Sequence, residues 1–353
     1  MKRIVLCVLF FALCAVFGFA QSDLQPAAIV KLTKSEPITV KQFRTEVERM
    51  EKAAGRSLND SEKKQVLDAM INERLAIQAA DRDKVTVSEN EINQQIQQLR
   101  DTLTQRAGRQ VTDTEFATAI RSETGLEMPA FREQARRQLI VQKYLLSKKQ
   151  NLFENIKEPS EAEILDIYNL SKAQFVRPET VRFSYIRIPY GSDRVKAKEL
   201  ADRLYREVGS NSSSSSRFNE VVMKGQIANS GYQSGDGGYL PRLPEAQQFF
   251  GEDFIKAAFS LKIEEVSRLM ESPAGNQFAG YQFIKITEAY SMKILELDDI
   301  YRLGVPMTVR DTIKYTLLQE KQQTILAQAT EELVTELRAG GKSFEIFNRN
   351  LGW

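Results

Sequence analysis

A strand that looks largely buried carries a hydrogen-bonding amide among apolar side chains. The segment AGYQFIKITE, residues 279–288, alternates as a β-strand does, with Tyr281, Phe283 and Lys285 on one face. Gln282 lies on the other face, in line with two isoleucines. A side-chain amide can donate a hydrogen bond to a bound group. Two interpretations are open: Gln282 faces a functional site, or it lies at a strand edge and reaches water.

The chain after its first twenty residues contains neither histidine nor cysteine. The whole sequence has no histidine, and both cysteines, Cys7 and Cys14, lie in the N-terminal segment. Thiolate nucleophiles, disulfide frameworks, Cys/His zinc sites and serine triads with an imidazole base are therefore excluded. The adjacent carboxylates Glu264 and Glu265 stand just before a predicted strand. We expect them to lie in a solvent-exposed turn, so they do not support a hydrolase site.

The charge distribution disfavours nucleic-acid and nucleotide partners. The net charge of +2 equals that of Lys2 and Arg3, so the rest of the chain is balanced, and no polybasic stripe stands out. The segment AGGKS near the C-terminus resembles the end of a phosphate-binding loop, but Glu336 stands where the loop needs its first glycine. We interpret Gly340 and Gly341 as a helix stop. We expect no cofactor and no metal.

The N-terminus has the pattern of a cleaved export signal. Two basic residues precede an apolar run, residues 4–17. This run is shorter than the about 20 residues that a membrane-spanning helix needs. Gly18 and Ala20 supply the small residues of a cleavage site. We expect residues 1–20 to be a signal peptide that is cleaved after Ala20, and the mature protein to be periplasmic. The alternative is an uncleaved anchor.

Residues 36–150 are predicted to form about five helices, because capping boxes mark where helices begin. In a capping box a hydroxyl accepts from a free N–H of the first turn, and an acid or amide three residues later bonds back. Four pairs match: Thr39 with Gln42, Ser88 with Glu91, Thr112 with Glu115, and Ser160 with Glu163. Further helices are predicted from near Asp60 and over 129–149, with Pro129 in the first turn. Residues 28–34 are predicted to form a short strand.

An α+β module is predicted after the helical region. A strand is expected at 181–188, a helix at 193–208, and two closing strands near 266–270 and 281–287. A short helix is expected around EDFIKAAFSL, before the closing strands.

Two segments stand out by composition. The serine-rich segment 211–216 is of low complexity and is predicted to be a flexible loop. The glycine-rich segment 229–242 precedes the short helix and contains GDGGYLPR, which we interpret as a turn.

One long helix, residues 308–338, is predicted near the C-terminus. Its apolar residues recur at four-residue spacing: Val309, Ile313, Leu317, Ile325, Ala329, Leu333 and Leu337. Such a stripe must be buried, and the N-terminal helices are the available partners. The sequence therefore predicts a multidomain α+β fold. An all-α domain is split by an inserted α+β module, and the long C-terminal helix packs back on the N-terminal helices.

The order and spacing of several segments resemble those of a known family. The N-terminal region contains AIVKLTKSEPITVKQFRTEVERM, VLDAMINERLAIQAADRDKVTVSENEINQQI and FREQARRQLIVQKYL, which resemble the chaperone domain of the SurA/PrsA group of exported folding factors. The middle contains VRFSYIRI, GDGGYLPR, FFGEDFIKAAFSLKIEEVSRLMESPAG and GYQFIKITE, which resemble a parvulin-type prolyl isomerase domain. The resemblance covers nearly all of the mature chain. It implies a helical chaperone domain over 21–174 and 291–353, with a parvulin-like domain over 175–290.

The resemblance also implies that the polar site of the isomerase is degenerate. Active parvulins carry histidines where this chain has Tyr185 and Gln282, and a cysteine or aspartate where it has Ala228. Phe250 and Phe254 keep the apolar character of the substrate-binding positions.

We expect isomerase activity to be weak or absent. Rotation about an X–Pro bond has a barrier of about 18–20 kcal/mol from amide resonance and breaks no bond, so a dry pocket with hydrogen-bond donors can lower it. Tyr185 and Gln282 are candidate donors. Loss of a positioned polar group costs about 100- to 1000-fold in rate. The aromatic residues of the module form either a peptide-binding surface or simply core: Tyr239, Phe249, Phe250 and Phe254.

The function predicted first is that of an ATP-independent periplasmic chaperone. Its partners would be unfolded exported polypeptides, in the SurA branch outer-membrane β-barrels, with membrane contact only through those clients. Two alternatives stay open: an active peptidyl-prolyl isomerase, and a structural envelope protein that reuses the fold.

Overall fold

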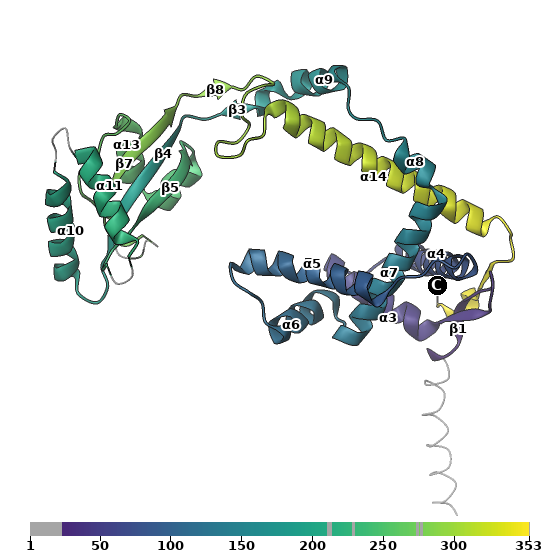
Figure 1. Cartoon of the computed structure of the whole chain (residues 1–353). Coiled ribbons are helices and arrows are strands. Elements are labelled where there is room, and N and C mark those ends of the chain that lie inside the picture. The colour runs from purple at the N-terminus through teal and green to yellow at the C-terminus, as the bar shows by residue number, and fades with distance from the viewer. Residues whose placement is uncertain (1–22, 210–213, 228–229, 273–274, 276–277, 353) are drawn as a thin grey trace, which may run out of the picture. The chain divides into compact units, whose positions relative to one another are not determined.

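The structure is a computed structural model, and it describes residues 23–209, 214–227, 230–272, 275 and 278–352 (Figure 1). The chain is mixed helix and sheet and divides into two compact units. Unit 1 comprises Met1–Lys157 with Glu320–Trp353, and unit 2 comprises Glu158–Gln319. The predicted signal peptide lies outside the described residues. Among the described residues, no helix has the length and apolar character needed to span a bilayer.

Unit 1 contains the helices that the sequence predicts between residues 36 and 150. They are α3 (Val40–Ala54), α4 (Asp60–Arg82), α5 (Glu89–Ala107), α6 (Asp113–Thr124), α7 (Met128–Lys148) and the short α8 (Gln150–Glu154). All four predicted capping boxes are present at their helix starts. A fifth, formed by Asn59 and Glu62 at the start of α4, was not predicted; its first residue carries an amide in place of the hydroxyl.

Unit 1 also contains a three-stranded sheet, so the expectation of an all-α domain is wrong. Strand β1 (Pro26–Val30) lies between β2 (Glu36–Thr39) and β9 (Phe344–Ile346), and both pairings are antiparallel. The C-terminal strand thus lies beside a strand from the start of the described chain (Figure 1). β2 and β9 contain four and three residues, too few to show a period of two in the sequence.

The C-terminal part of α14 (Val309–Arg338) packs on the N-terminal helices within unit 1. Ala329 and Leu333 share a buried cluster with Leu67, Ile71 and Leu75 of α4. This is the packing that the apolar stripe predicts for the second half of the long helix.

Charged residues reinforce the same contact. Lys149 is 7% exposed, and its ammonium lies 2.6 Å from a carboxylate oxygen of Glu336 and 3.0 Å from one of Glu332. The hydrogen bond with Glu336 raises the pKa of Lys149. Arg338 lies 2.8 Å from Asp68 of α4. A buried cation with two carboxylate partners fixes where α14 meets the end of α7, because separation would leave the charge unpaired.

The first turns of α14 belong to a different core. Val309 and Ile313 pack with Ile164, Tyr168 and Phe175 in unit 2. The stripe therefore serves two cores, and the expectation that all of it packs on the N-terminal helices is wrong for its first part. Periodicity shows that a face is apolar, and it does not show which partner covers each turn.

The units divide at other positions than residues 174 and 290. Helix α9 (Glu161–Ser171) and the start of α14 share one core, and both fall in unit 2 together with η1 (Lys172–Gln174). Strand β3 (Val176–Arg177) pairs with β8 (Lys293–Ile294), and Tyr168 donates a hydrogen bond to the Leu295 carbonyl. Whether the parvulin-like region is an inserted domain stays a prediction.

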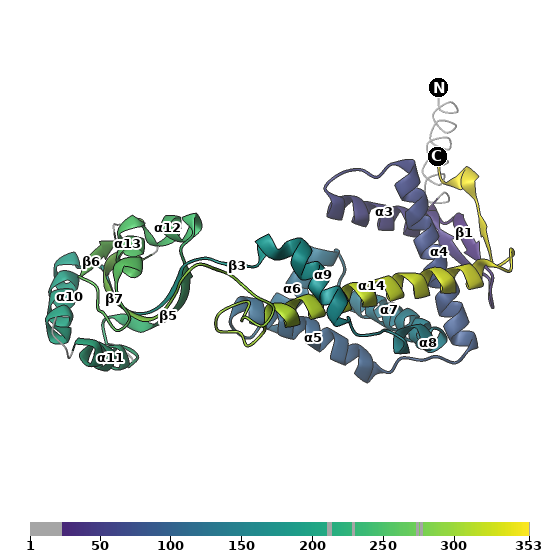
Figure 2. The ribbon, with the colours of Figure 1, turned by 90° about the horizontal axis from the view of Figure 1, so that it is seen from above.

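The main sheet of unit 2 is antiparallel, with strand order β5-β4-β7-β6. Its strands are β4 (Thr180–Pro189), β5 (Gln233–Pro241), β6 (Met270–Ser272) and β7 (Gly280–Tyr290). Helices α10 (Arg194–Val208) and α11 (Ser214–Gly225) cover one face, and α12 (Pro244–Phe250) and α13 (Glu252–Ser260) cover the other (Figure 2). The strands predicted at 181–188 and 281–287 and the helix predicted at 193–208 are confirmed.

Two predictions of irregular structure in unit 2 are wrong. The glycine-rich segment contains strand β5, whose glycines and exposed polar residues show no apolar alternation. In the serine-rich segment, residues 211–213 lie outside the described residues, but Ser214–Ser216 are the first residues of α11. A serine run has the composition of a loop, but here its last three residues form the first turn of a helix.

Candidate functional site

A cavity of about 250 Å³ lies in unit 2 between the sheet and helices α12 and α13. We call it the aromatic pocket. Nine residues line it: Phe183, Tyr185, Arg187, Asp236, Gly237, Phe250, Phe254, Phe278 and Gln282.

The aromatic pocket brings together four of the five site residues predicted from the sequence. Tyr185 comes from β4, Gln282 from β7, Phe250 from α12 and Phe254 from α13. The fifth, Ala228, lies outside the described residues. Shared position supports a common site, and the roles of these residues stay predictions.

Packed phenylalanine rings form the apolar wall of the pocket. The Phe250 ring stacks on Phe254 at a centroid distance of 4.8 Å and on Phe278 at 5.3 Å. Phe183 meets Phe254 edge to face at 5.4 Å. Phe254 is 4% exposed and belongs to the core, whereas Phe250 is only partly buried and Phe249 is 48% exposed. Rings packed in this way present a firm apolar surface to a ligand.

Two glycines allow these rings to converge. Gly251 separates α12 from α13 with φ of 90°, a conformation that a residue with a Cβ rarely adopts, so the chain turns between Phe250 and Phe254. A Cβ on Gly237 would lie 2.3 Å from the Phe183 ring, so only glycine lets β5 pass this close.

Gln282 is buried beneath the pocket and is hydrogen-bonded. It is 6% exposed, and its Nε2 donates to Ser272 Oγ at 2.8 Å. Strand β7 lies between β4 and β6, so it is not an edge strand. The interpretation of Gln282 as an edge residue that reaches water is therefore wrong. A buried amide with a partner is the expected way to keep a polar group in an apolar wall.

Tyr185 lies over the glycine-rich strand. A Cβ on Gly235 would be 3.9 Å from the Tyr185 hydroxyl oxygen, which places the ring against β5. Tyr185 is partly buried, and its hydroxyl has no hydrogen-bond partner within the part of the chain that the structure describes. A phenol in this position can donate to a ligand or to water.

Asp236 is held in an ion-pair network at one end of the pocket. Its carboxylate lies 2.6 Å from Arg182 and accepts from the Gly238 N–H at 2.8 Å. Arg182 also lies 2.8 Å from Glu288. The hydrogen bond from Arg182 holds the pKa of the Asp236 carboxyl below its usual value, so this group is anionic at neutral pH.

Arg187 lies at the other end of the same wall. Its guanidinium centre is 4.6 Å from the Phe278 ring centroid and 5.7 Å from that of Tyr185. Its Nε donates to Gln233 Oε1 at 3.0 Å. This cation therefore borders the ring surface of the pocket.

The arrangement offers groups that can bind an apolar ligand. They are ring faces, an amide, a phenol, a guanidinium and the ion-paired Asp236 carboxylate; the sequence supplies no imidazole or thiolate after residue 20. The described residues contain no cluster of three or more groups that could hold a metal ion. An apolar side chain or a proline ring is the ligand that such a wall fits.

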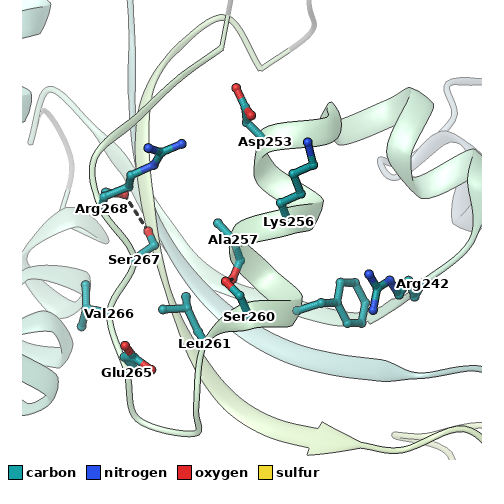
Figure 3. A pocket seen from close by; sticks show the side chains of 11 residues that line it. Arg242, Asp253, Lys256, Ala257, Ser260, Leu261, Glu265, Val266, Ser267 and Arg268 are labelled. Carbon is teal, nitrogen blue, oxygen red and sulfur yellow. Dashed lines mark hydrogen bonds between the residues drawn. The ribbon is translucent and has the colours of Figure 1, made fainter.

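A larger depression of about 590 Å³ lies on the other side of α13, and we call it the α13 hollow. Figure 3 shows Asp253, Lys256 and Ser260 of α13 facing the segment that carries Ser267 and Arg268. Ser267 donates a hydrogen bond to the Arg268 carbonyl at 2.8 Å.

Two of the charges of the α13 hollow are paired. Arg242 lies 2.7 Å from Glu179, and Lys256 lies 2.5 Å from Glu252. Most of the side chains that line the hollow are charged or polar, so it lacks the apolar ring wall of the aromatic pocket.

Five residues that line the aromatic pocket were not predicted as site residues: Phe183, Arg187, Asp236, Gly237 and Phe278. The first two alternate with Tyr185 on β4, so the period of a strand contained the signal. Phe278 precedes β7 in a segment without periodicity, and nothing in its neighbourhood predicted its position.

Comparisons of the sequence with known proteins agree on one kind of relative. A family model described as the SurA-like N-terminal domain matches residues 1–145. The foldase protein PrsA of Clostridium botulinum strain Okra is 24% identical over 293 residues, which cover 82% of this chain and 76% of that protein. Chaperone SurA of Saccharophagus degradans is 24% identical over 355 residues, which cover 95% of this chain and 76% of that protein.

Solved structures add two distant matches. One comes from work on PEB4 and Cj1289, two SurA-like chaperones of Campylobacter jejuni; it covers 91% of this chain and 99% of the solved chain at 13% identity and a TM-score of 0.39. The other is foldase protein PrsA of Streptococcus pneumoniae, with 17% identity and a TM-score of 0.26 over 87% of this chain and 91% of that one.

Proposed function

We propose that the chain is a SurA/PrsA-like folding factor that acts as an ATP-independent chaperone and binds unfolded exported polypeptides. The matching family model and the PrsA and SurA relatives support the chaperone role. We propose three further points: that the chaperone works without ATP, that its clients are exported proteins, and that its isomerase region has weak or no activity.

The observation that carries the proposal is the aromatic pocket. Its ring wall is open to a ligand at Phe250, and Gln282 and Tyr185 add polar groups beside that wall. A client segment with an apolar side chain or a proline would gain contact area there, and exchange would stay fast because the pocket is small.

We propose further that this region binds peptides and isomerises them weakly or not at all. The positions taken by histidines in active parvulins are Tyr185 and Gln282 here, and the amide of Gln282 already donates to Ser272. A donor held by a protein partner is less free to stabilise a twisted peptide bond, so the rate should fall by about 100-fold or more.

Unit 1 offers a second apolar surface for clients. Leu146 is 43% exposed and borders a groove of about 430 Å³ that Phe153 also lines. Exposed apolar side chains beside a groove are the kind of surface that covers unfolded chains.

Export and the class of client rest on the N-terminal segment and on the SurA relatives. We propose that residues 1–20 are removed after Ala20 and that the mature chain acts in the periplasm on outer-membrane proteins. The partners are polypeptides, and no nucleotide or nucleic acid is involved.

Light scattering tests this function. An outer-membrane protein is unfolded in urea and diluted into buffer without nucleotide, with or without the mature chain. The proposal predicts suppressed aggregation at about equal molar amounts, as expected for stoichiometric binding. Unchanged scattering would contradict the chaperone role and would favour a structural envelope protein.

A further inference from the structure

The strongest unexplained charge at the aromatic pocket is that of Arg187. Its guanidinium packs against Phe278 and Tyr185, both of which line the cavity. It forms no ion pair with the residues that the structure describes. Its Nε and Nη2 both donate to Gln233 Oε1, which is a neutral acceptor.

Two other arginines of unit 2 that lie over rings differ from Arg187 in their partners. Arg182 lies 2.6 Å from Asp236 and 2.8 Å from Glu288. Arg242 lies 2.7 Å from Glu179. Both therefore have carboxylate partners, although both lie over aromatic rings as Arg187 does.

The geometry of Arg187 leaves donors available. A guanidinium has five N–H donors in a plane, and the bonds to Gln233 use the Nε and Nη2 edge. Nη1 has no hydrogen bond to the described residues, so it can donate to an incoming acceptor. Carboxylates are the strongest match for such a planar group, and partial burial beside rings limits screening by salt.

The carboxylate of Asp236 does not cancel this charge. It is engaged by Arg182 and by the Gly238 N–H. On β5 it stands three residues from Gln233, which corresponds to about 10 Å along a strand. A ligand at the Arg187 end of the pocket therefore meets a cation without a nearby free anion.

We propose that the aromatic pocket prefers extended peptide segments in which a carboxylate side chain stands next to the apolar residue or proline that enters the pocket, and that Arg187 binds this carboxylate. The inference rests on the proposed function and names the class of client segment that this site selects. Side-chain carboxylates are the relevant source, since an unfolded chain has many of them and only one C-terminus.

Fluorescence anisotropy with the mature full chain tests the preference. Short peptides with blocked ends and a neutral fluorophore contain a Phe-Pro pair preceded by Glu or by Gln. The Glu peptide should bind about fivefold more tightly than the Gln peptide, as expected for one charge-assisted contact. Arg187→Gln should abolish the difference, and Arg187→Lys should keep only part of it because the planar fork is lost.

Arg242→Gln is the matched control. Arg242 also lies over a phenylalanine ring, but its charge is already paired and it lines the α13 hollow. This variant should keep the full preference for the Glu peptide. Thermal melting of each variant confirms that the fold is retained, and Arg187→Lys gives a second variant if Arg187→Gln melts early.

Several outcomes would overturn the inference. They are equal binding of the two peptides, a preference that survives Arg187→Gln, and an equal loss in Arg242→Gln. If neither peptide binds but aggregation of an unfolded client is still suppressed, the inference fails and the proposed function stands. If suppression is also absent, both fail.

Discussion

The two cavities beside α13 differ in a way that size alone does not indicate. The α13 hollow has a volume of about 590 Å³, and the aromatic pocket about 250 Å³. In the hollow, Arg242 and Lys256 already have carboxylate partners. In the pocket, stacked rings lie beside Gln282 and beside Arg187, which has no carboxylate partner among the described residues.

The chemistry of the lining distinguishes these two cavities better than their volumes do. A charged and polar lining gains little from an apolar ligand, because the ligand would remove water from the charges. A ring wall that faces solvent gains the full burial of its apolar area. Four predictions follow from this contrast, and each pairs a change in the pocket with a reference for it.

The largest expected difference between the cavities is in peptide affinity. Phe250 and Phe259 are both partly buried, and both pack on the same core cluster. Phe250→Ala should weaken binding of a Phe-Pro peptide about tenfold or more, because a central aromatic contact is lost. Phe259→Ala, in the hollow, should change affinity by less than about twofold. Anisotropy titrations measure both.

Both variants should lose similar stability, roughly 2–3 kcal/mol, since each removes a partly buried ring. Urea unfolding therefore separates a loss of fold from a loss of binding. A tenfold loss in Phe259→Ala as well would show that the pocket has no special role.

Removing a buried polar side chain should destabilise the fold more in the hollow than in the pocket. In the hollow, Ser267 Oγ accepts from the Ile284 N–H at 3.0 Å, so Ser267→Ala leaves a buried backbone donor unpaired. This variant should lose about 1–3 kcal/mol in the free energy of unfolding. Gln282→Leu removes its bond to the hydroxyl of Ser272, which can rotate toward another acceptor, and should lose about 1 kcal/mol. The opposite order in urea unfolding would contradict the assignment of these bonds.

The preference for acidic peptides should be moderately sensitive to salt. Raising ionic strength from about 0.05 to about 0.5 M shortens the screening length, so the ratio of Glu to Gln peptide affinities should fall by about twofold. The affinity of the Gln peptide should stay nearly constant, because ring contacts are not screened. A constant ratio across this range would indicate that the preference is not electrostatic.

The smallest effect concerns Asp236 and pH. The bond from Arg182 lowers the pKa of the folded carboxyl, so this ion pair stabilises the fold above the unfolded pKa of about 3.9 and the contribution is lost as pH falls through the folded value. The Asp236 side chain is 49% exposed, so the contribution should be below about 1 kcal/mol. Asp236→Asn should thus be slightly less stable than the native chain at pH 6, and the difference should shrink as pH falls below about 3.9. A difference that grows in acid would have the wrong sign.

The fold was predictable where local chemistry decides it. The four hydroxyl capping boxes and the strands around Tyr185 and Gln282 were found because capping and alternation act within a few residues. Strands β2, β5 and β9 were missed because they are short or rich in glycine, so that their pairing partners define them. The two cores along α14 were also hidden, since one apolar stripe is compatible with any covering surface.

The site was predictable in the same uneven way. Strand period placed Gln282 on a face with apolar residues, and the family resemblance placed Tyr185, Phe250 and Phe254. The isolated charge of Arg187 was not predictable, because it depends on where every neighbouring carboxylate lies after folding. The lack of a carboxylate partner for Arg187 becomes visible only in the folded structure of unit 2.

The aromatic pocket is proposed to bind a proline peptide without isomerising it efficiently. A single titration tests this: one Phe-Pro peptide is followed by anisotropy for binding and by NMR exchange for cis–trans interconversion, beside a histidine-containing parvulin. We expect saturable binding that Phe250→Ala weakens, with cis–trans exchange at least about 100-fold slower than the parvulin produces. Exchange as fast as that of the parvulin at the same occupancy would contradict it.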